Sequence, residues 1–191
     1  MKPSELDGII RKCLFSISDE IAPDDWRGRE REIVSRFCFG YLIHSYDPDR
    51  IGMEVAVPQL RKPVLRKCNP KVKRPRKDVS KDVVIWPRPK TAVFDSNWKP
   101  CQQPLAVMEW TVINHSDDKS AKKKKETKYE QDQCWLRRKS KPKSMAGFVG
   151  YAVFVDTTSN PKQLKCARVS TGEVCSEWLI LSASQPSIPA L

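Results

Sequence analysis

The chain has 191 residues, of which 39% are hydrophobic and 30% are charged, and its formal net charge is +12. This length fits one domain with a real core and is hardly enough for two. No apolar run reaches the roughly 18 residues that a membrane-spanning helix needs, and charged residues interrupt the N-terminal segment where a signal peptide would be apolar. We therefore expect a cytoplasmic protein without a membrane partner.

Two helices are predicted near the N-terminus. Over residues 4–17, apolar side chains recur at helical spacing behind Ser4, which can cap the first turn. Pro23 interrupts the pattern, and a longer helix is predicted over residues 26–44. Its apolar side chains form one stripe, and Glu30 lies at the end of that stripe. Glu30 is therefore expected to point inward.

A strand and a long excursion are predicted next. Residues 53–57 alternate in a way that places Met53, Val55 and Val57 on one face of a strand. Residues 58–80 are proline-rich and basic, so we interpret them as an excursion from the core and not as a regular element.

The remaining elements alternate between strands and one helix. Residues 82–86 predict a short buried strand, and residues 105–113 are apolar on both faces, which indicates a central strand. Helical spacing continues over residues 121–139. Residues 148–156 and 163–170 predict two further strands joined by a turn.

The order of these elements predicts the fold class. We expect a single α/β domain over residues 1–181, with a mixed central β-sheet flanked by helices and a core over about residues 26–170. Residues 173–181 predict an edge strand, and residues 182–191 a flexible tail.

Basic residues gather in three clusters, at residues 61–77, 119–128 and 137–143. Such clusters favour a polyanionic partner, because binding releases counterions from the polyanion. Nucleic acid is the preferred partner, and DNA more than RNA; an acidic membrane surface or mere solubility are the alternatives. The residues expected to bind nucleic acid are Lys71, Lys73, Arg74, Arg76, Lys123, Lys124, Lys125 and, by stacking on a base, Trp98.

Three acids form the most informative pattern. Glu109 lies in the middle of an otherwise apolar strand, and burying an unpaired carboxylate there is unfavourable. Asp82 opens another buried strand, and Glu30 lies on the inward face of a helix. Three such carboxylates predict a hard-oxygen site for Mg²⁺ or Mn²⁺. The alternative is that Glu30 and Glu109 form ordinary ion pairs with nearby Arg or Lys.

The chain resembles the PD-(D/E)XK nuclease superfamily, whose core is restriction-endonuclease-like. Residues 81–86 (KDVVIW) resemble its first acidic motif and residues 108–112 (MEWTV) its second. Residues 132–138 (DQCWLRR) and 147–156 (GFVGYAVFVD) resemble the helix and strand that follow. The resemblance covers roughly residues 26–170.

The resemblance implies that Asp82 and Glu109 bind the metal and that Glu30 supports it. It also implies a lysine two residues after the second acid, where this chain has Thr111. A hydroxyl cannot replace the charge of an ammonium group. Either Lys128 or Lys125 supplies the ammonium from the next helix, or catalysis is weak or lost.

Three functions follow from these patterns. The first is a metal-dependent nuclease that hydrolyses phosphodiester bonds in DNA, in defence or repair; a homodimer stays open as the assembly that cuts both strands. The second is a nucleic-acid-binding module that has lost catalysis at Thr111. The third is a basic assembly protein that docks on acidic partners.

Overall fold

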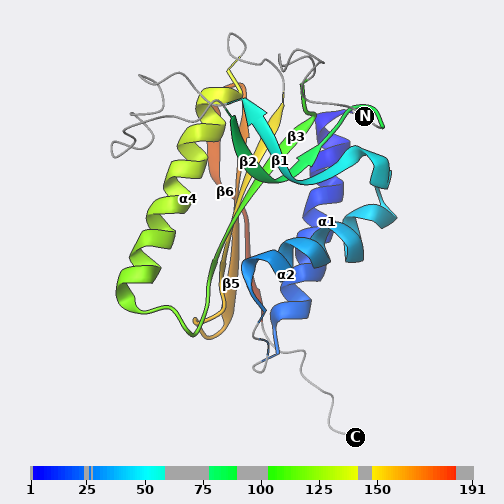
Figure 1. Ribbon diagram of the computed structural model, residues 1–191. Helices are drawn as coiled ribbons and strands as arrows, with labels where there is room; N and C mark the ends of the chain where they lie inside the picture. Colours follow the sequence, from blue (N-terminus) through cyan, green and yellow to red (C-terminus); the bar gives the residue numbers. More distant parts are fainter. Residues whose placement is uncertain are drawn as a thin grey trace, which may run out of the picture.

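The computed structural model describes residues 2–23, 26, 28–58, 78–89, 103–141 and 148–183. The helices and strands, in chain order, are α1 (Pro3–Ile21), α2 (Glu30–Ser35), β1 (Ile51–Pro58), β2 (Asp78–Ile85), β3 (Ala106–Ile113), α4 (Lys119–Lys139), β4 (Val149–Asp156), β5 (Lys162–Ser170) and β6 (Glu173–Ala183). Figure 1 shows them along the chain. No helix in the described ranges is both long enough and apolar enough to span a bilayer.

The strands form one six-stranded sheet whose spatial order follows the chain, from β1 at one edge to β6 at the other. Neighbouring strands are antiparallel except β3 and β4, which are parallel. Helix α4 makes the crossover between these two, as a parallel connection requires. This confirms a single α/β domain with a mixed sheet.

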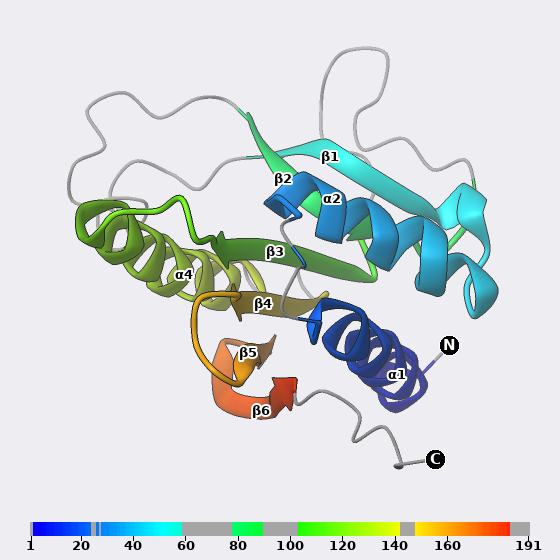
Figure 2. The same ribbon diagram turned by 90° about the horizontal axis from the view of Figure 1, so that it is seen from below.

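Helices cover both faces of the sheet. In Figure 2, α1 and α2 lie on one side of the strands and α4 lies on the other. The larger hydrophobic core lies under α1 and α2, and a smaller one lies under α4. All eight residues of β3 are buried, because this strand contributes to both cores. The prediction of a central strand is therefore confirmed.

Both predicted N-terminal helices are present, but they begin and end at other residues than predicted. Helix α1 begins at Pro3, and the backbone N–H of Lys2 donates to the Glu5 carboxylate, so the predicted cap at Ser4 is wrong. Helix α2 begins at Glu30 instead of residue 26. It continues as a π-helical segment (Arg36–Tyr41) and a 3₁₀ turn (Leu42–His44).

The predicted face of β1 is wrong. Met53 packs against the core under α1 and α2, whereas Val55 and Val57 pack under α4. Strict alternation would have kept all three on one side. The backbone of Glu54 explains the difference, because its φ of 51° is left-handed and rotates the strand between Met53 and Val55.

The later elements are confirmed within a few residues, including β6 as the far edge strand. The predicted excursion is shorter than residues 58–80, because residue 58 belongs to β1 and residues 78–80 belong to β2. Residues 59–77 lie outside the described part of the chain. Of the predicted tail, residues 182 and 183 belong to β6, and residues 184–191 are not described.

Candidate functional site

Strand β2 leaves β3 halfway along its length, and this divergence creates the candidate site. The β2–β3 pairing runs from Ile85↔Ala106 to Val83↔Met108 and stops there, although β3 continues to Ile113. Alternate residues of a strand direct their backbone groups to the same edge. The backbone groups of Trp110 and Val112 therefore face the edge that β2 has left, and they need other partners.

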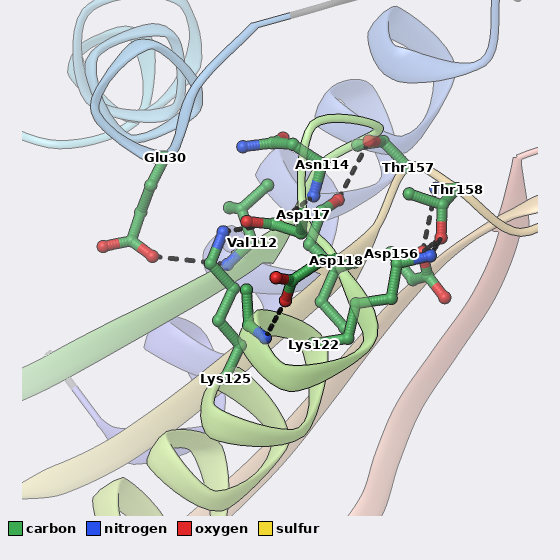
Figure 3. A network of polar contacts seen from close by, with 12 residues as sticks. Glu30, Val112, Asn114, Asp117, Asp118, Lys122, Lys125, Asp156, Thr157 and Thr158 are labelled. Carbon is green, nitrogen blue, oxygen red and sulfur yellow. Dashed lines mark hydrogen bonds and ion pairs between the residues drawn. The ribbon is translucent and has the colours of Figure 1, made fainter.

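Side chains from three elements supply these partners. The Asp82 carboxylate of β2 accepts from Trp110 N at 2.6 Å, and the Glu30 carboxylate of α2 accepts from Val112 N at 3.3 Å. Lys128 of α4 donates to the Trp110 carbonyl at 2.6 Å and to Glu30 at 3.3 Å. Figure 3 shows Glu30 directed at the backbone of Val112. Asp82, Glu30 and Lys128, which we call the edge group, thus meet along the open edge of β3.

Glu109 lies behind the edge group, on the α4 side of β3, and is 5% exposed. Its Oε1 forms an ion pair with Nζ of Lys81, which is equally buried. Lys81 reaches this face because of the turn at Glu54: it pairs with Val55, which has already rotated toward α4. Regular alternation from Val83 would have placed Lys81 on the opposite face.

Helix α4 contributes two residues beside Lys81, namely Trp135 and Asp132. The Lys81 ammonium lies 3.8 Å from the ring centroid of Trp135, a cation–π contact. Burial lowers the pKa of Lys81 to about 8, although the carboxylates of Asp132 and Asp82 raise it. Burial also raises the pKa of Asp132 to about 6, against the opposing effect of Lys81 and Lys128. Lys81, Glu109 and Asp132, here called the inner group, therefore interact with the edge group.

Thr111 occupies the position where the resemblance implies a lysine. It lies on the same side of β3 as Glu109, is 1% exposed, and its Oγ1 has no hydrogen-bond partner. Thr111 therefore supplies no positive charge at the position where the resemblance implies an ammonium group. The ammonium groups near Glu109 and Glu30 come instead from Lys81 and Lys128.

These acids have the oxygen donors that Mg²⁺ or Mn²⁺ prefers, but their arrangement does not fit such an ion. In the described part of the chain, no three acidic, histidine or cysteine side chains are arranged to hold a metal. Each predicted ligand has another partner: Asp82 binds Trp110 N, while Glu30 and Glu109 pair with lysines. The observed contacts of Glu30 and Glu109 match the alternative of ordinary ion pairs.

The structure separates the two lysines considered as replacements for the missing ammonium. Lys128 lies at the edge group, whereas Lys125 pairs with Asp117 at 2.6 Å. Asp117 also accepts from Asn114 N at 2.7 Å. Desolvation opposes ionisation of Asp117, but the bond from Asn114 and the charge of Lys125 outweigh it, so its pKa is lowered. Lys125 is therefore part of the loop network in Figure 3.

The predicted nucleic-acid contacts are only partly described. Lys123 and Lys124 are exposed on the first half of α4, next to the half-buried Lys125. The other five, namely Lys71, Lys73, Arg74, Arg76 and Trp98, lie outside the described residues.

Sequence reasoning missed the roles of Lys81, Asp132 and Trp135. The signal for Asp132 was available, since Lys128, Asp132 and Trp135 recur at i, i+4 and i+7 and therefore share one helix face. Lys81 offered no comparable signal, because strand alternation placed it in the opposite core.

Comparison with protein-family models, with curated proteins and with solved structures found no match to this chain.

Proposed function

We propose that this protein is a nuclease that hydrolyses phosphodiester bonds at the edge group. The supporting observation is the meeting of Asp82, Glu30 and Lys128 at the open edge of β3, in a chain with a net charge of +12. The restriction-endonuclease-like core suggested by residues 81–86 and 108–112 belongs to the same proposal. DNA is the preferred substrate.

The carboxylates and the ammonium group of the edge group can take complementary roles in hydrolysis. Its carboxylates can orient a water molecule and accept its proton, as general bases do. The Lys128 side chain is 43% exposed and its ammonium can stabilise the charge that develops on a phosphate. Glu109 is too buried to meet a substrate in this arrangement, so its role is to hold Lys81 and the β2–β3 divergence in place. The expected Mg²⁺ or Mn²⁺ dependence stays a prediction.

A second candidate is a nucleic-acid-binding module without catalysis. The observation that favours it is the ion pair between Lys81 and Glu109, which neutralises the buried acid of the second motif. The hydroxyl of Thr111 adds no charge there. The exposed lysines of α4 would then bind phosphates, while the acids would serve only to stabilise the open edge of β3.

The deciding experiment measures cleavage of single- and double-stranded DNA and RNA with Mg²⁺, with Mn²⁺ and with a chelator. The variants are Asp82→Asn, Lys128→Gln and Thr111→Lys. Asp82→Asn keeps an oxygen that can accept from Trp110 N, so it removes the charge with little effect on the fold. Glu177→Gln, an exposed acid on β6 at the opposite edge of the sheet, is the control of equal charge.

For a nuclease we expect cleavage that falls by about 10²-fold or more in Asp82→Asn and Lys128→Gln and is unchanged in Glu177→Gln. Cleavage by Thr111→Lys alone would identify a disabled nuclease. If neither the parent nor any variant cleaves nucleic acid, and the parent binds it in a salt-sensitive way, catalysis is rejected in favour of the binding module.

A further inference from the structure

An exposed ion pair between α2 and β1 lies beside the edge group. Arg31 follows Glu30 directly in α2, and its guanidinium donates to both carboxylate oxygens of Glu54, from Nε at 2.9 Å and from Nη2 at 3.2 Å. Glu54 lies across the β1–β2 hairpin from Asp82, because the strand pairings on either side of Glu54 flank Asp82. Arg31 therefore adjoins the edge group on its β1 side, whereas Lys128 reaches the group from α4.

Both partners of this ion pair are open to solvent. The side chain of Arg31 is 84% exposed and that of Glu54 is 54% exposed. An exposed ion pair contributes little to stability, so another anion can replace the Glu54 carboxylate without disturbing the fold. The two N–H groups that fit a carboxylate also fit a phosphate in the same bidentate way. Arg31 is therefore already oriented to bind a phosphate.

The residue type at position 54 supports a role for its side chain. The φ of Glu54 is 51°, a left-handed value at which glycine or asparagine is more usual than glutamate. The turn of the backbone at this point does not by itself need a carboxylate. The carboxylate is used on Arg31, whose guanidinium it holds beside the edge group.

Two cations thus lie on opposite sides of the open edge of β3. In Figure 2, α2 and α4 lie on opposite faces of the sheet, and Arg31 belongs to α2 and Lys128 to α4. The Asp82 carboxylate lies between them, on Trp110 N. A nucleic-acid backbone that crosses this edge can therefore place one phosphate at each cation.

We propose that Arg31 binds a phosphate of the nucleic acid, and that Glu54 holds the Arg31 guanidinium in the free protein until that phosphate replaces the carboxylate. This inference rests on the proposed function, because it names a further substrate-binding residue of the same site. It assigns one phosphate contact to each face of the sheet, Arg31 from α2 and Lys128 from α4. Glu54 competes with the phosphate and thereby lowers the affinity for nucleic acid.

The test measures binding of the full chain to a short fluorescent duplex DNA by anisotropy, with a chelator present so that metal-dependent cleavage does not interfere. The variants are Arg31→Gln, Arg31→Lys, Glu54→Gln and the double variant Arg31→Gln/Glu54→Gln. Two exposed residues away from the edge group provide controls of equal charge change, Lys12→Gln on α1 for the loss of a base and Glu177→Gln on β6 for the loss of an acid.

The expected effects on affinity have opposite signs at the two positions. Arg31→Gln should weaken binding by about fivefold at about 0.1 M salt and lower the salt slope by about 1. Arg31→Lys should keep the slope but bind less tightly than the parent, because an ammonium group cannot contact a phosphate with two parallel bonds. Glu54→Gln should tighten binding by about threefold, more than Glu177→Gln does, and this gain should vanish in the double variant.

Two results would overturn the proposal. One is an affinity of Arg31→Gln equal to that of Lys12→Gln, and the other is a gain in Glu54→Gln that persists when Arg31 is also replaced. Lys128→Gln, measured in the same way, separates this inference from the proposed function. A loss of affinity in Lys128→Gln alone rejects only the contact at Arg31, whereas no loss in either variant rejects the edge group as the site. A loss in Arg31→Gln, with a parent that does not cleave, supports the contact and rejects catalysis.

Discussion

At the scale of single residues, burial decides what each acid of this protein can do. Glu109 lies in an apolar strand and is neutralised by the equally buried Lys81. Asp132 has lysines nearby, yet burial still raises its pKa to about 6. Asp117, at the loop after β3, receives a backbone hydrogen bond and a lysine, and its pKa is lowered. The contributions of these two carboxylates, Asp132 and Asp117, to the free energy of unfolding therefore change with pH in opposite directions.

Asp132→Asn tests the effect of burial. The pKa of Asp132 is raised by burial from 3.8 to about 6, so its folded form binds protons more readily than its unfolded form. Its contribution to stability is present at low pH and is lost as pH rises through the folded value. We expect the free energy of unfolding of Asp132→Asn, relative to the parent, to increase by about 1–3 kcal/mol between pH 5 and pH 8 in urea denaturation.

Asp117→Asn provides the comparison of opposite sign. The folded pKa of Asp117 is lowered, so its stabilising contribution is present above the unfolded value and is lost as pH falls through the folded one. The free energy of unfolding of Asp117→Asn relative to the parent should therefore fall as pH rises from about 2 to about 5. Equal pH profiles for the two variants would contradict this account of both acids.

At the scale of elements, one residue of β1 determines which face carries Lys81. The left-handed backbone of Glu54 rotates the strand, and the rotation carries Val55 and its partner Lys81 to the α4 side. The same stretch of β2 separates from β3, which frees the backbone edge that Asp82 then contacts. The position of the inner group therefore depends on the rotation at Glu54, and that of the edge group on the divergence of β2 from β3.

Substitutions of Glu54 test this role. A β-branched residue is poorly suited to positive φ, so Glu54→Val should lower the free energy of unfolding by about 1–3 kcal/mol, while Glu54→Gly should keep it. Glu54→Gln controls for the exposed ion pair with Arg31, which is worth at most about 1 kcal/mol. Urea denaturation measures all three. A loss in Glu54→Gln as large as in Glu54→Val would assign the effect to the ion pair.

At the scale of the whole molecule, the fold decides where the basic residues lie, and the net charge decides which class of partner they favour. The mixed sheet places the α4 lysines and the edge group on neighbouring parts of the domain, since Lys128 belongs to both. The net charge of +12 favours polyanions without specifying a sequence. Affinity for nucleic acid should therefore come mainly from phosphate contacts.

The salt dependence of binding tests the contribution of α4. Each lysine that contacts a phosphate adds about 0.9 to the slope of log affinity against log salt concentration on duplex DNA. Replacing Lys123 or Lys124 by Gln should lower that slope by about 1 in fluorescence anisotropy titrations. Lys12→Gln, on the opposite face of the sheet, should leave it unchanged. Equal slopes for all three variants would exclude the exposed face of α4 from the interface.

Much of the fold could be predicted from periodicity. Apolar spacing located α1, α4 and the central strand β3, because an element must bury the face or faces that its sequence makes apolar. The start of α2 was less predictable, because nothing in the spacing separates residues 26–29 from the helix that begins at Glu30. Helix ends depend on local capping more than on the apolar stripe.

The sequence by itself determined that Glu109 needs a partner, because a carboxylate in an apolar strand cannot be buried alone. Only the tertiary structure decided that this partner is Lys81, and that Lys128 rather than Lys125 contacts Glu30. Those pairings join residues far apart in the chain, across a strand rotation at Glu54 and a divergence of β2 from β3. Local spacing contains no information about either, because both depend on how the strands twist and pack against the helices.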